Sequence, residues 1–354
     1  SRFEKKFAEY MGVKHAVTTV NGSVSLRLAL LASGVSAGDE VIVPPVTFIA
    51  TASVVVEINC IPVFVDIDPD TLNIDPDKIE EAITPRTRAI IPVHFAGLAC
   101  DMDRIMNIAR EHSLIVIEDA CHAHGAEYKG KKLGSIGHAG CFSFQSSKNM
   151  ASGEGGIVIT NDDSIFELAD SLHNVGRKAG GAWYEHYSLG CNYRMTQFQA
   201  AILEVQLSRL ESEVYRRNEN GLYLDELLKN VDGITPMKRG KEITKHSYHL
   251  YPFRYDRSKF RNKSKAEFAA MLAAEGVPCF MGYPLPLHKQ DVFQDKRFFS
   301  YLIPENVSYR NVNSPESERI CYEEGMWILQ QAMLGEKEDM EDIVKAILKI
   351  RDNL

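Results

Sequence analysis

Two segments carry the residues best suited to chemistry, IVIEDACHAHGA around Asp119 and FSFQSSKNMASGEGG around Lys148. Asp119 ends an apolar, strand-like run, and a carboxylate in that position needs a partner. Lys148 stands on a glycine-rich connection, where a lysine held in a pocket can lose its proton and attack an aldehyde. The alternatives are that Asp119 caps a turn or pairs with an arginine, and that Lys148 is a solvated loop residue.

A third segment, VTTVNGSVSLRLALLA, places Gly22 and Ser23 at the start of an amphipathic helix. Free N–H groups and the helix dipole bind phosphate at such a position, although a serine there is more often a plain N-cap. No G-x-G-x-x-G or P-loop motif is present, which argues against dinucleotide and nucleoside triphosphate binding. A phosphate cradle, a carboxylate for a ring nitrogen and a Schiff-base lysine together predict a site for pyridoxal 5′-phosphate, or PLP.

The composition is that of an ordinary globular protein. The 354 residues suffice for about two domains, with 45% hydrophobic and 25% charged residues and a net charge of −8. No apolar run reaches the ~20 residues of a membrane span, and no basic stretch is longer than residues 129–132. We therefore expect no membrane or nucleic-acid partner.

The seven cysteines are odd in number, widely spaced and without a Cys-x-x-Cys pair. This pattern predicts reduced, buried thiols in a cytoplasmic protein rather than disulfides or a metal site. The chain begins without Met and already in a helical pattern, so we expect further residues before Ser1.

Apolar and amphipathic segments alternate along the first part of the chain. Strand-like runs cover residues 40–44, 61–66, 88–95, 114–119, 140–144 and 156–160, and helical patterns cover 23–33, 101–112 and 164–174. This alternation predicts an α/β fold with a mostly parallel sheet that binds its ligand at the carboxyl ends of the strands.

The second part of the chain has a different pattern. A long helix is predicted from residue 195 to 230, followed by a strand at 246–255 and helices at 264–275 and 336–351. We therefore expect a large cofactor-binding domain at residues 1–230 and a smaller C-terminal α+β domain at 231–354.

Over nearly its whole length the chain resembles the DegT/DnrJ/StrS family of PLP-dependent sugar aminotransferases, a branch of the fold-type-I PLP enzymes. The segments VIEDACHAHGA and FSFQSSKNMASGEGGIVITND are the most specific matches, supported by NGSVSLRLAL and GCNYRMTQFQAAIL. The resemblance implies the fold-type-I architecture. It also implies transfer of an amino group from L-glutamate or L-glutamine to a keto sugar, a nucleotide keto sugar or a cyclitol ketone.

The resemblance also implies roles for individual residues. Lys148 would carry the internal aldimine and shuttle the proton, and Asp119 would pair with the pyridinium nitrogen. The other implied cofactor contacts are Gly22, Ser23 and Ser143 at the phosphate, His122 at the ring hydroxyl, Phe48 or else Phe95 on the ring face, and Asn192 at the phosphate of the neighbouring subunit. The contact from Asn192 implies a homodimer with shared active sites.

The sequence departs from the family pattern in two places. Many members carry Gln where this chain has His122, while His124 is interpreted as structural. The closing segment CYEEGMWILQQAMLGEKEDM lacks the Leu-Pro-rich pattern of nucleotide-sugar members and is closer to the branch that acts on cyclitols, amino sugars and aminoshikimate-type compounds.

Candidate substrate contacts are Arg177, Arg194, Tyr283 and His288. The alternative for each is an ordinary surface charge or a core aromatic residue. Trp183 and Tyr184 either line a sugar site or pack a dimer.

Three other functions fit parts of the sequence. A family dehydratase would carry His in place of Lys148. A non-catalytic regulator that binds PLP or a sugar would use the same fold. A nicotinamide-dependent dehydrogenase would need a glycine fingerprint after the first strand, and none is present.

Overall fold

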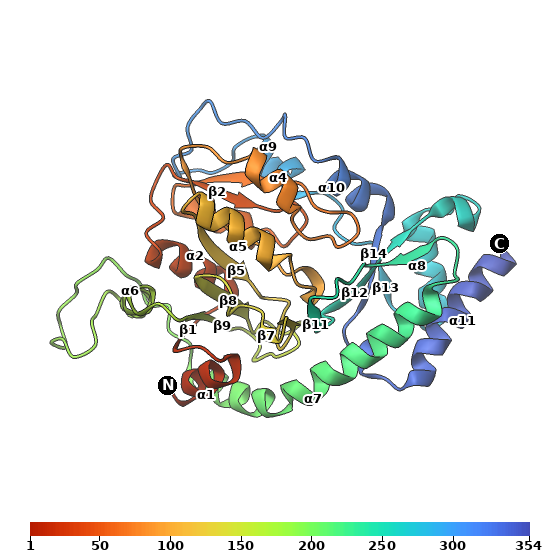
Figure 1. Ribbon diagram of the computed structural model, residues 1–354, viewed down its shortest axis with the longest axis horizontal. Coiled ribbons are helices and arrows are strands. Elements are labelled where there is room, and N and C mark those ends of the chain that lie inside the picture. The colour runs from red at the N-terminus through yellow and green to blue at the C-terminus, as the bar shows by residue number, and fades with distance from the viewer.

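The computed structural model describes residues 1–354 and shows two unequal parts joined by one long helix (Figure 1). The larger part is built on a seven-stranded sheet. In spatial order its strands are β1 (His15–Thr19), β9 (Gly156–Thr160), β8 (Ala139–Ser143), β5 (Ile115–Asp119), β4 (Thr87–Ile90), β2 (Glu40–Val43) and β3 (Ile61–Phe64). The five strands from β8 to β3 run parallel, and β9 runs antiparallel to β8 and β1, so the predicted mostly parallel sheet is confirmed.

Helices cover both faces of this sheet. One face packs on α1 (Arg2–Met11), α5 (Met102–Glu111) and the start of α7 (Gln197–Leu228), and the other packs on α2 (Gly22–Ala32), α3 (Ala50–Glu57) and α6 (Asp163–His173). Neighbouring strand residues alternate between the two cores: Ile42 faces the first, while Val41 and Val43 face the second. Burial on both faces explains the continuous apolar runs in the sequence.

The structure departs from the strand prediction at the run 88–95 and at β1. The run at 88–95 forms only β4, because Pro92 lacks the N–H needed to continue a sheet and the chain turns into a short 3-10 helix at Phe95–Gly97. β1 was not anticipated. It contains only five residues and pairs with a single neighbour, β9.

The smaller part is an antiparallel sheet in the order β10 (Ile234–Pro236), β12 (Leu250–Tyr255), β14 (Gly325–Leu329) and β13 (Cys279–Phe280). It packs on α8 (Lys265–Ala274) and α11 (Lys337–Asn353). The 32-residue helix α7 bridges the two parts, with Leu210 in the first core and Leu224 in the last.

The chain then returns from the smaller part to the larger one. Leu287, Phe293 and Tyr309, around the short helix α9 (Asp291–Gln294), pack in the core that covers β2 and β3. The short helix α10 (Pro315–Arg319) follows before β14. A domain division at residue 230 therefore stays a proposal, because part of 231–354 belongs to the core of the larger part.

A buried carboxylate fixes the end of β5. Glu118 is fully buried, and its two oxygens accept hydrogen bonds from the main-chain N–H groups of Gly134, Ile136 and Gly137 at 2.6–2.7 Å and pair with His94 Nε2 at 2.8 Å. These bonds hold the turn that leads into β8. The adjacent Asp119 takes no part in these hydrogen bonds.

The cysteines are free thiols, and five of the seven are buried. Cys191 is exposed, so the expectation of buried thiols is wrong for that residue. None of the helices combines the length and the apolar character needed to cross a membrane.

Candidate active site

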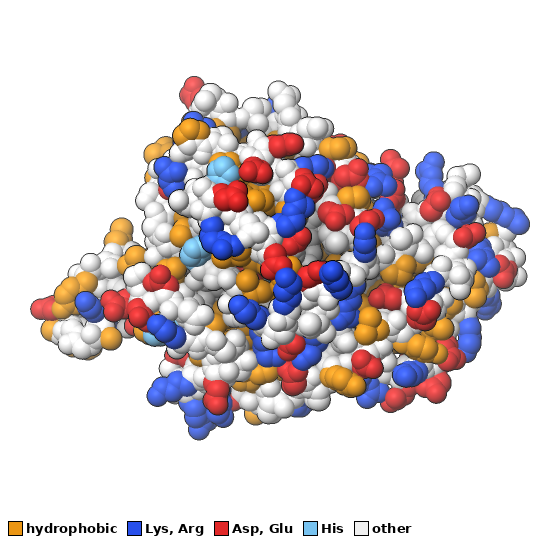
Figure 2. Space-filling model, viewed as in Figure 1, with side chains coloured by type: hydrophobic (Ala, Val, Ile, Leu, Met, Phe, Trp, Pro, Cys, Tyr) orange, Lys and Arg blue, Asp and Glu red, His pale blue; other side chains and the backbone are white.

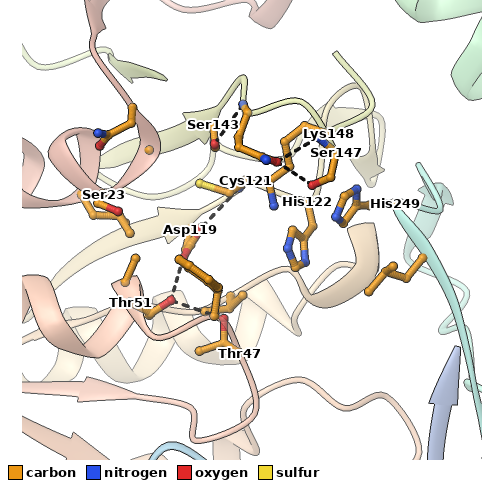
Figure 3. Close-up of a pocket in the computed structure, with 18 of the residues that line it drawn as sticks. Ser23, Thr47, Thr51, Asp119, Cys121, His122, Ser143, Ser147, Lys148 and His249 are labelled. Atoms are coloured by element: carbon orange, nitrogen blue, oxygen red, sulfur yellow. Dashed lines mark hydrogen bonds between the residues drawn. The ribbon is translucent and has the colours of Figure 1, made fainter. Parts of the chain in front are cut away.

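A cavity of about 590 Å³ opens at the carboxyl ends of β1, β2, β5 and β8 (Figure 3). Residues of the smaller part, from β12 and β14, complete its wall. The cavity brings together eight of the residues selected from the sequence: Gly22, Ser23, Phe48, Asp119, His122, Ser143, Lys148 and Tyr283. A ligand site at this edge of the sheet is the one predicted for an open α/β fold.

The N-terminus of α2 forms one end of the cavity. Asn21 is the N-cap, and its Oδ1 accepts a hydrogen bond from the Val24 N–H at 2.9 Å, so the alternative that Ser23 is a plain N-cap is wrong. Ser23 lies in the first turn, and its side chain lines the cavity. A Cβ at Gly22 would lie 2.8 Å from Ser143 Cβ, which explains the glycine. Exposed N–H groups with two nearby hydroxyls suit a phosphate.

Asp119 lies at the end of β5 and is 5% exposed. Its Oδ2 accepts a hydrogen bond from Thr51 Oγ1 at 2.8 Å, and its Oδ1 accepts one from the Cys121 N–H at 3.2 Å. The second bond caps the following turn, as the structural alternative expected. No arginine pairs with Asp119, so the other alternative is wrong, and the carboxylate keeps capacity for a cationic ligand.

Thr47 extends this arrangement, with its Oγ1 3.3 Å from Thr51 Oγ1. The sequence analysis did not predict either threonine as a site residue: Thr51 lies in the first turn of α3, and Thr47 lies in the loop that precedes this helix.

Lys148 reaches the cavity from the turn after β8 (Figure 3). Its main-chain N–H donates to Gln145 O at 2.9 Å, which shapes the turn. Its Nζ makes no hydrogen bond or ion pair with the protein. Burial lowers the pKa of this amine, while nearby Cys121 and Asp119 oppose the shift. The solvated-loop alternative is therefore wrong, because the Lys148 side chain lines the cavity and burial lowers the pKa of its amine.

His122 and His249 stack in the cavity wall, with ring centroids 4.3 Å apart. His122 Nδ1 accepts a hydrogen bond from the Ala96 N–H at 3.3 Å, so the neutral ring carries its proton on Nε2. Burial, and then the charge of Lys148, lower the pKa of both rings well below the usual value, which keeps them neutral. His249 had no local sequence signal.

His124 is a core residue. It packs against Phe142 and Phe144, neither ring nitrogen has a hydrogen-bond partner, and burial lowers its pKa to about 3. The structural interpretation of His124 fits this position. Phe95, the second choice for the ring-stacking residue, is also buried and does not line the cavity, whereas Phe48 lines it and is 59% exposed.

Four other selected residues lie outside the cavity. His288 is fully buried beside Phe64, so its prediction as a substrate contact is wrong. Arg194 Nη1 donates to Asn174 Oδ1 at 2.8 Å, and Arg177 packs over the Trp183 ring. Asn192 is exposed, and its main chain bridges to Asn174.

Arg177, Asn192 and Arg194 belong to a loop at 177–196 that projects from the larger part (Figure 1). Hydrophobic side chains gather on this projection (Figure 2). Trp183 is 77% exposed, Tyr184 75% and Leu189 99%. Phe198 and Val205 extend the apolar surface along the start of α7.

Comparisons with known proteins identify relatives over nearly the whole chain. A model of the DegT/DnrJ/EryC1/StrS aminotransferase family matches residues 1–347. The L-glutamine:2-deoxy-scyllo-inosose aminotransferase of Streptomyces fradiae is 36% identical over 363 residues, which cover 99% of this chain and 85% of that protein.

Two solved structures have the same fold. The crystal structure of 3-amino-5-hydroxybenzoic acid synthase superposes with a TM-score of 0.89 and 31% identity, covering 100% of this chain and 90% of that chain. DesV of S. venezuelae, solved in complex with a ketimine intermediate, gives a TM-score of 0.86 and 32% identity over 100% of this chain and 89% of that one.

The fold and these matches define a fold-type-I aminotransferase. The chain belongs to the DegT/DnrJ/EryC1/StrS aminotransferase family, whose members use PLP.

The state of the Lys148 amine can be tested on the protein without added cofactor. Because burial lowers its pKa, Lys148 should reach half of its maximal reaction rate with acetic anhydride at a lower pH than Lys345, whose pKa is raised by its hydrogen bond to Asp342. Competitive labelling followed by peptide mass spectrometry measures both rates. Equal pH midpoints for the two lysines would contradict the lowered pKa of Lys148.

Proposed function

We propose that this chain binds PLP through Lys148 and transfers the amino group of L-glutamine to the ketone of a cyclitol or sugar. The observation that carries the proposal is the position of three groups around one cavity: an unpaired lysine amine, a carboxylate held by Thr51, and a helix N-terminus lined by hydroxyls. These three groups complement an aldehyde, a pyridine nitrogen and a phosphate.

The cavity residues include a suitable partner for each polar part of PLP. Ser23, Ser143 and the first N–H groups of α2 would hold the phosphate. Asp119 would hold the ring nitrogen, and Phe48 would cover a face of the ring. Neutral His122, with its proton on Nε2, would donate to the ring oxygen, a role that Gln fills in many relatives. Bound PLP supplies an electrophilic aldehyde carbon and an acceptor for the electrons of the substrate's α-carbon.

The remaining chemistry falls to side chains of the chain itself. Lys148 Nζ would hold the cofactor through its aldehyde carbon and, once released, would accept a proton from the donor's α-carbon and return it to the cofactor. Asp119 would stabilise a positive charge on the ring nitrogen, and Thr51 Oγ1 fixes the Asp119 carboxylate by a hydrogen bond. The same steps in reverse order, with a ketone as acceptor, complete an amino transfer.

The cavity favours an acceptor without a diphosphate. Within one subunit, Lys148 is the only lysine or arginine in its lining, and a diphosphate is normally met by several such side chains. Tyr283 and Trp327 form an aromatic wall instead, with ring centroids 5.2 Å apart, which suits the C–H face of a cyclitol or sugar ring. L-glutamine as the donor is supported by the name of the Streptomyces fradiae relative.

The active unit that we propose is a homodimer. Asn192 lies on the projecting loop among exposed apolar side chains, an arrangement that fits contact with a second copy of the chain. In such a pair Asn192 would reach the phosphate end of the partner's cavity.

The first test follows the donor half of the reaction. Addition of L-glutamine to the PLP-loaded protein should bleach the visible band of the lysine-linked cofactor and release the corresponding keto acid. Lys148→Ala should lower the rate of release by about 10²–10⁴-fold, because the variant loses the group that moves the proton. An unchanged rate in this variant would overturn the mechanism, and no response to glutamine or glutamate would overturn the function.

The second test asks whether active sites are shared between subunits. Lys148→Ala and Asn192→Ala proteins should each be impaired, but their mixture should regain activity. A hybrid dimer pairs the intact Lys148 of one protomer with the intact Asn192 of the other. Activity after subunit exchange is the measurement.

A mixture of Lys148→Ala with Asp119→Ala is the matched control. Both residues line the same cavity of one chain, so no hybrid site is complete and no recovery is expected. Failure of the first mixture to recover, with exchange verified, would remove the shared-site proposal.

A further inference from the structure

The main chain at Lys148 is held by a residue of the smaller part. Gln330, just after β14, is 7% exposed, and its Nε2 donates to Ser147 O at 3.1 Å and to Lys148 O at 3.3 Å. The two carbonyls belong to the turn that carries the amine into the cavity. Gln330 lies more than 180 residues away in sequence, within the closing segment that departs from the Leu-Pro-rich pattern of nucleotide-sugar members.

Arg217 of α7 determines which way the Gln330 amide faces. Its Nη2 donates to Gln330 Oε1 at 2.6 Å. Because a guanidinium can only donate hydrogen bonds, it fixes Oε1 toward Arg217 and leaves Nε2 for the two carbonyls. The donor group of the amide is therefore directed at the turn of residues 145–149, called the lysine turn below.

The charge of Arg217 is only partly paired, by Glu213. Its side chain is 2% exposed, its Nε and Nη1 have no partner, and burial lowers its pKa to about 10. The nearest carboxylate, Glu213, lies 3.6 Å from Nη2 and is itself 27% exposed. Incompletely paired buried charges weaken a fold, so a residue of this kind points to a role beyond stability.

A second contact holds the other side of Lys148. Asn149 Nδ2 donates to Ser247 O at 2.8 Å, and its Oδ1 pairs with His249 Nδ1 at 3.2 Å. Ser247 and His249 immediately precede β12. The lysine turn is thus attached through polar contacts on both sides to the part of the chain that follows α7.

The strand that precedes Gln330 lines the cavity. Trp327 of β14, three residues before Gln330, lines the cavity, and its ring centroid lies 5.2 Å from that of Tyr283. The segment formed by β14 and Gln330 therefore contributes both to the wall of the site and to the support of the lysine.

We propose that Gln330, oriented by Arg217, is a positioning residue that fixes the main chain of Lys148 so that its Nζ points into the cavity. The inference rests on the proposed role of Lys148 in capturing PLP. Without the two hydrogen bonds the turn would relax, and the amine would spend less time in reach of an aldehyde. A displacement of about 1 Å in such a group costs roughly 10²-fold in rate.

Gln330→Glu separates this role from packing. Glutamate has the same shape and still accepts from Arg217, but it cannot donate to the two carbonyls. Gln330→Met is a second variant that fills the space without hydrogen bonds. Gln331→Ala is the matched control, since the neighbouring Gln331 is exposed.

The readouts are the rate of covalent PLP capture, followed by visible absorbance, and the exchange rate of the Lys148 amide hydrogen in the cofactor-free protein. Both Gln330 variants should capture PLP about 10–100-fold more slowly and exchange this amide faster. Combined with Lys148→Ala, they should bind PLP non-covalently as tightly as Lys148→Ala alone. Gln331→Ala should match the wild type.

Capture and amide exchange at the wild-type rate in both Gln330 variants would overturn the positioning role. The positioning role would also be overturned if the Gln330 variants weakened non-covalent PLP binding in the Lys148→Ala background as much as they slow covalent capture. The damage would then extend to the whole cavity. Failure of the wild-type protein itself to capture PLP would overturn the proposed function, and the positioning role with it.

Discussion

The unpaired amine of Lys148 is the constraint on which the site depends. An ammonium in a buried position loses hydration, and the nearby Cys121 and Asp119 only partly offset that loss, so the pKa of Lys148 falls. A neutral amine is a nucleophile, and a nucleophile is useful only if its position is fixed. The turn after β8 provides the position, and the helix N-terminus and Asp119 provide the two other ends of a ligand that the amine can reach.

The acidic pair at the end of β5 shows how the fold separates stability from chemistry. Consecutive strand residues face opposite sides of a sheet. Glu118 therefore points into the protein, where three N–H groups and His94 satisfy it, and it anchors the connection into β8. Asp119 points to the cavity, where Thr51 and one N–H satisfy it only in part. One carboxylate holds the scaffold, and its neighbour remains available to a cationic ligand.

The sequence predicted the features that depend on local pattern. The strand end at Asp119, the strand end and helix start that were predicted to within one residue of Ser143 and Gly22, and the turn at Lys148 follow from short-range rules. The parallel sheet brings these residues to one edge. Asn21 was not recognised as the N-cap, because Asn and Ser are almost equally good caps and neighbouring residues compete.

Contacts between residues far apart in the sequence could not be predicted from local patterns. Gln330 and His249 contact the lysine turn from 100 to 183 residues away, and Arg217 acts on it through Gln330. Nothing in their local sequence patterns marks these residues. His288 lies in a family-like motif, yet the structure buries its side chain completely beside Phe64. The roles of Asn192 and the projecting loop depend on a second chain.

The most direct test of the account is to treat the PLP-loaded protein with borohydride and map the labelled peptide by mass spectrometry. We expect a single stoichiometric adduct on Lys148, and the labelled fraction should fall when L-glutamine is added before the reductant. Labelling spread over surface lysines, or no stable adduct at all, would contradict the claim that the structure selects this one amine.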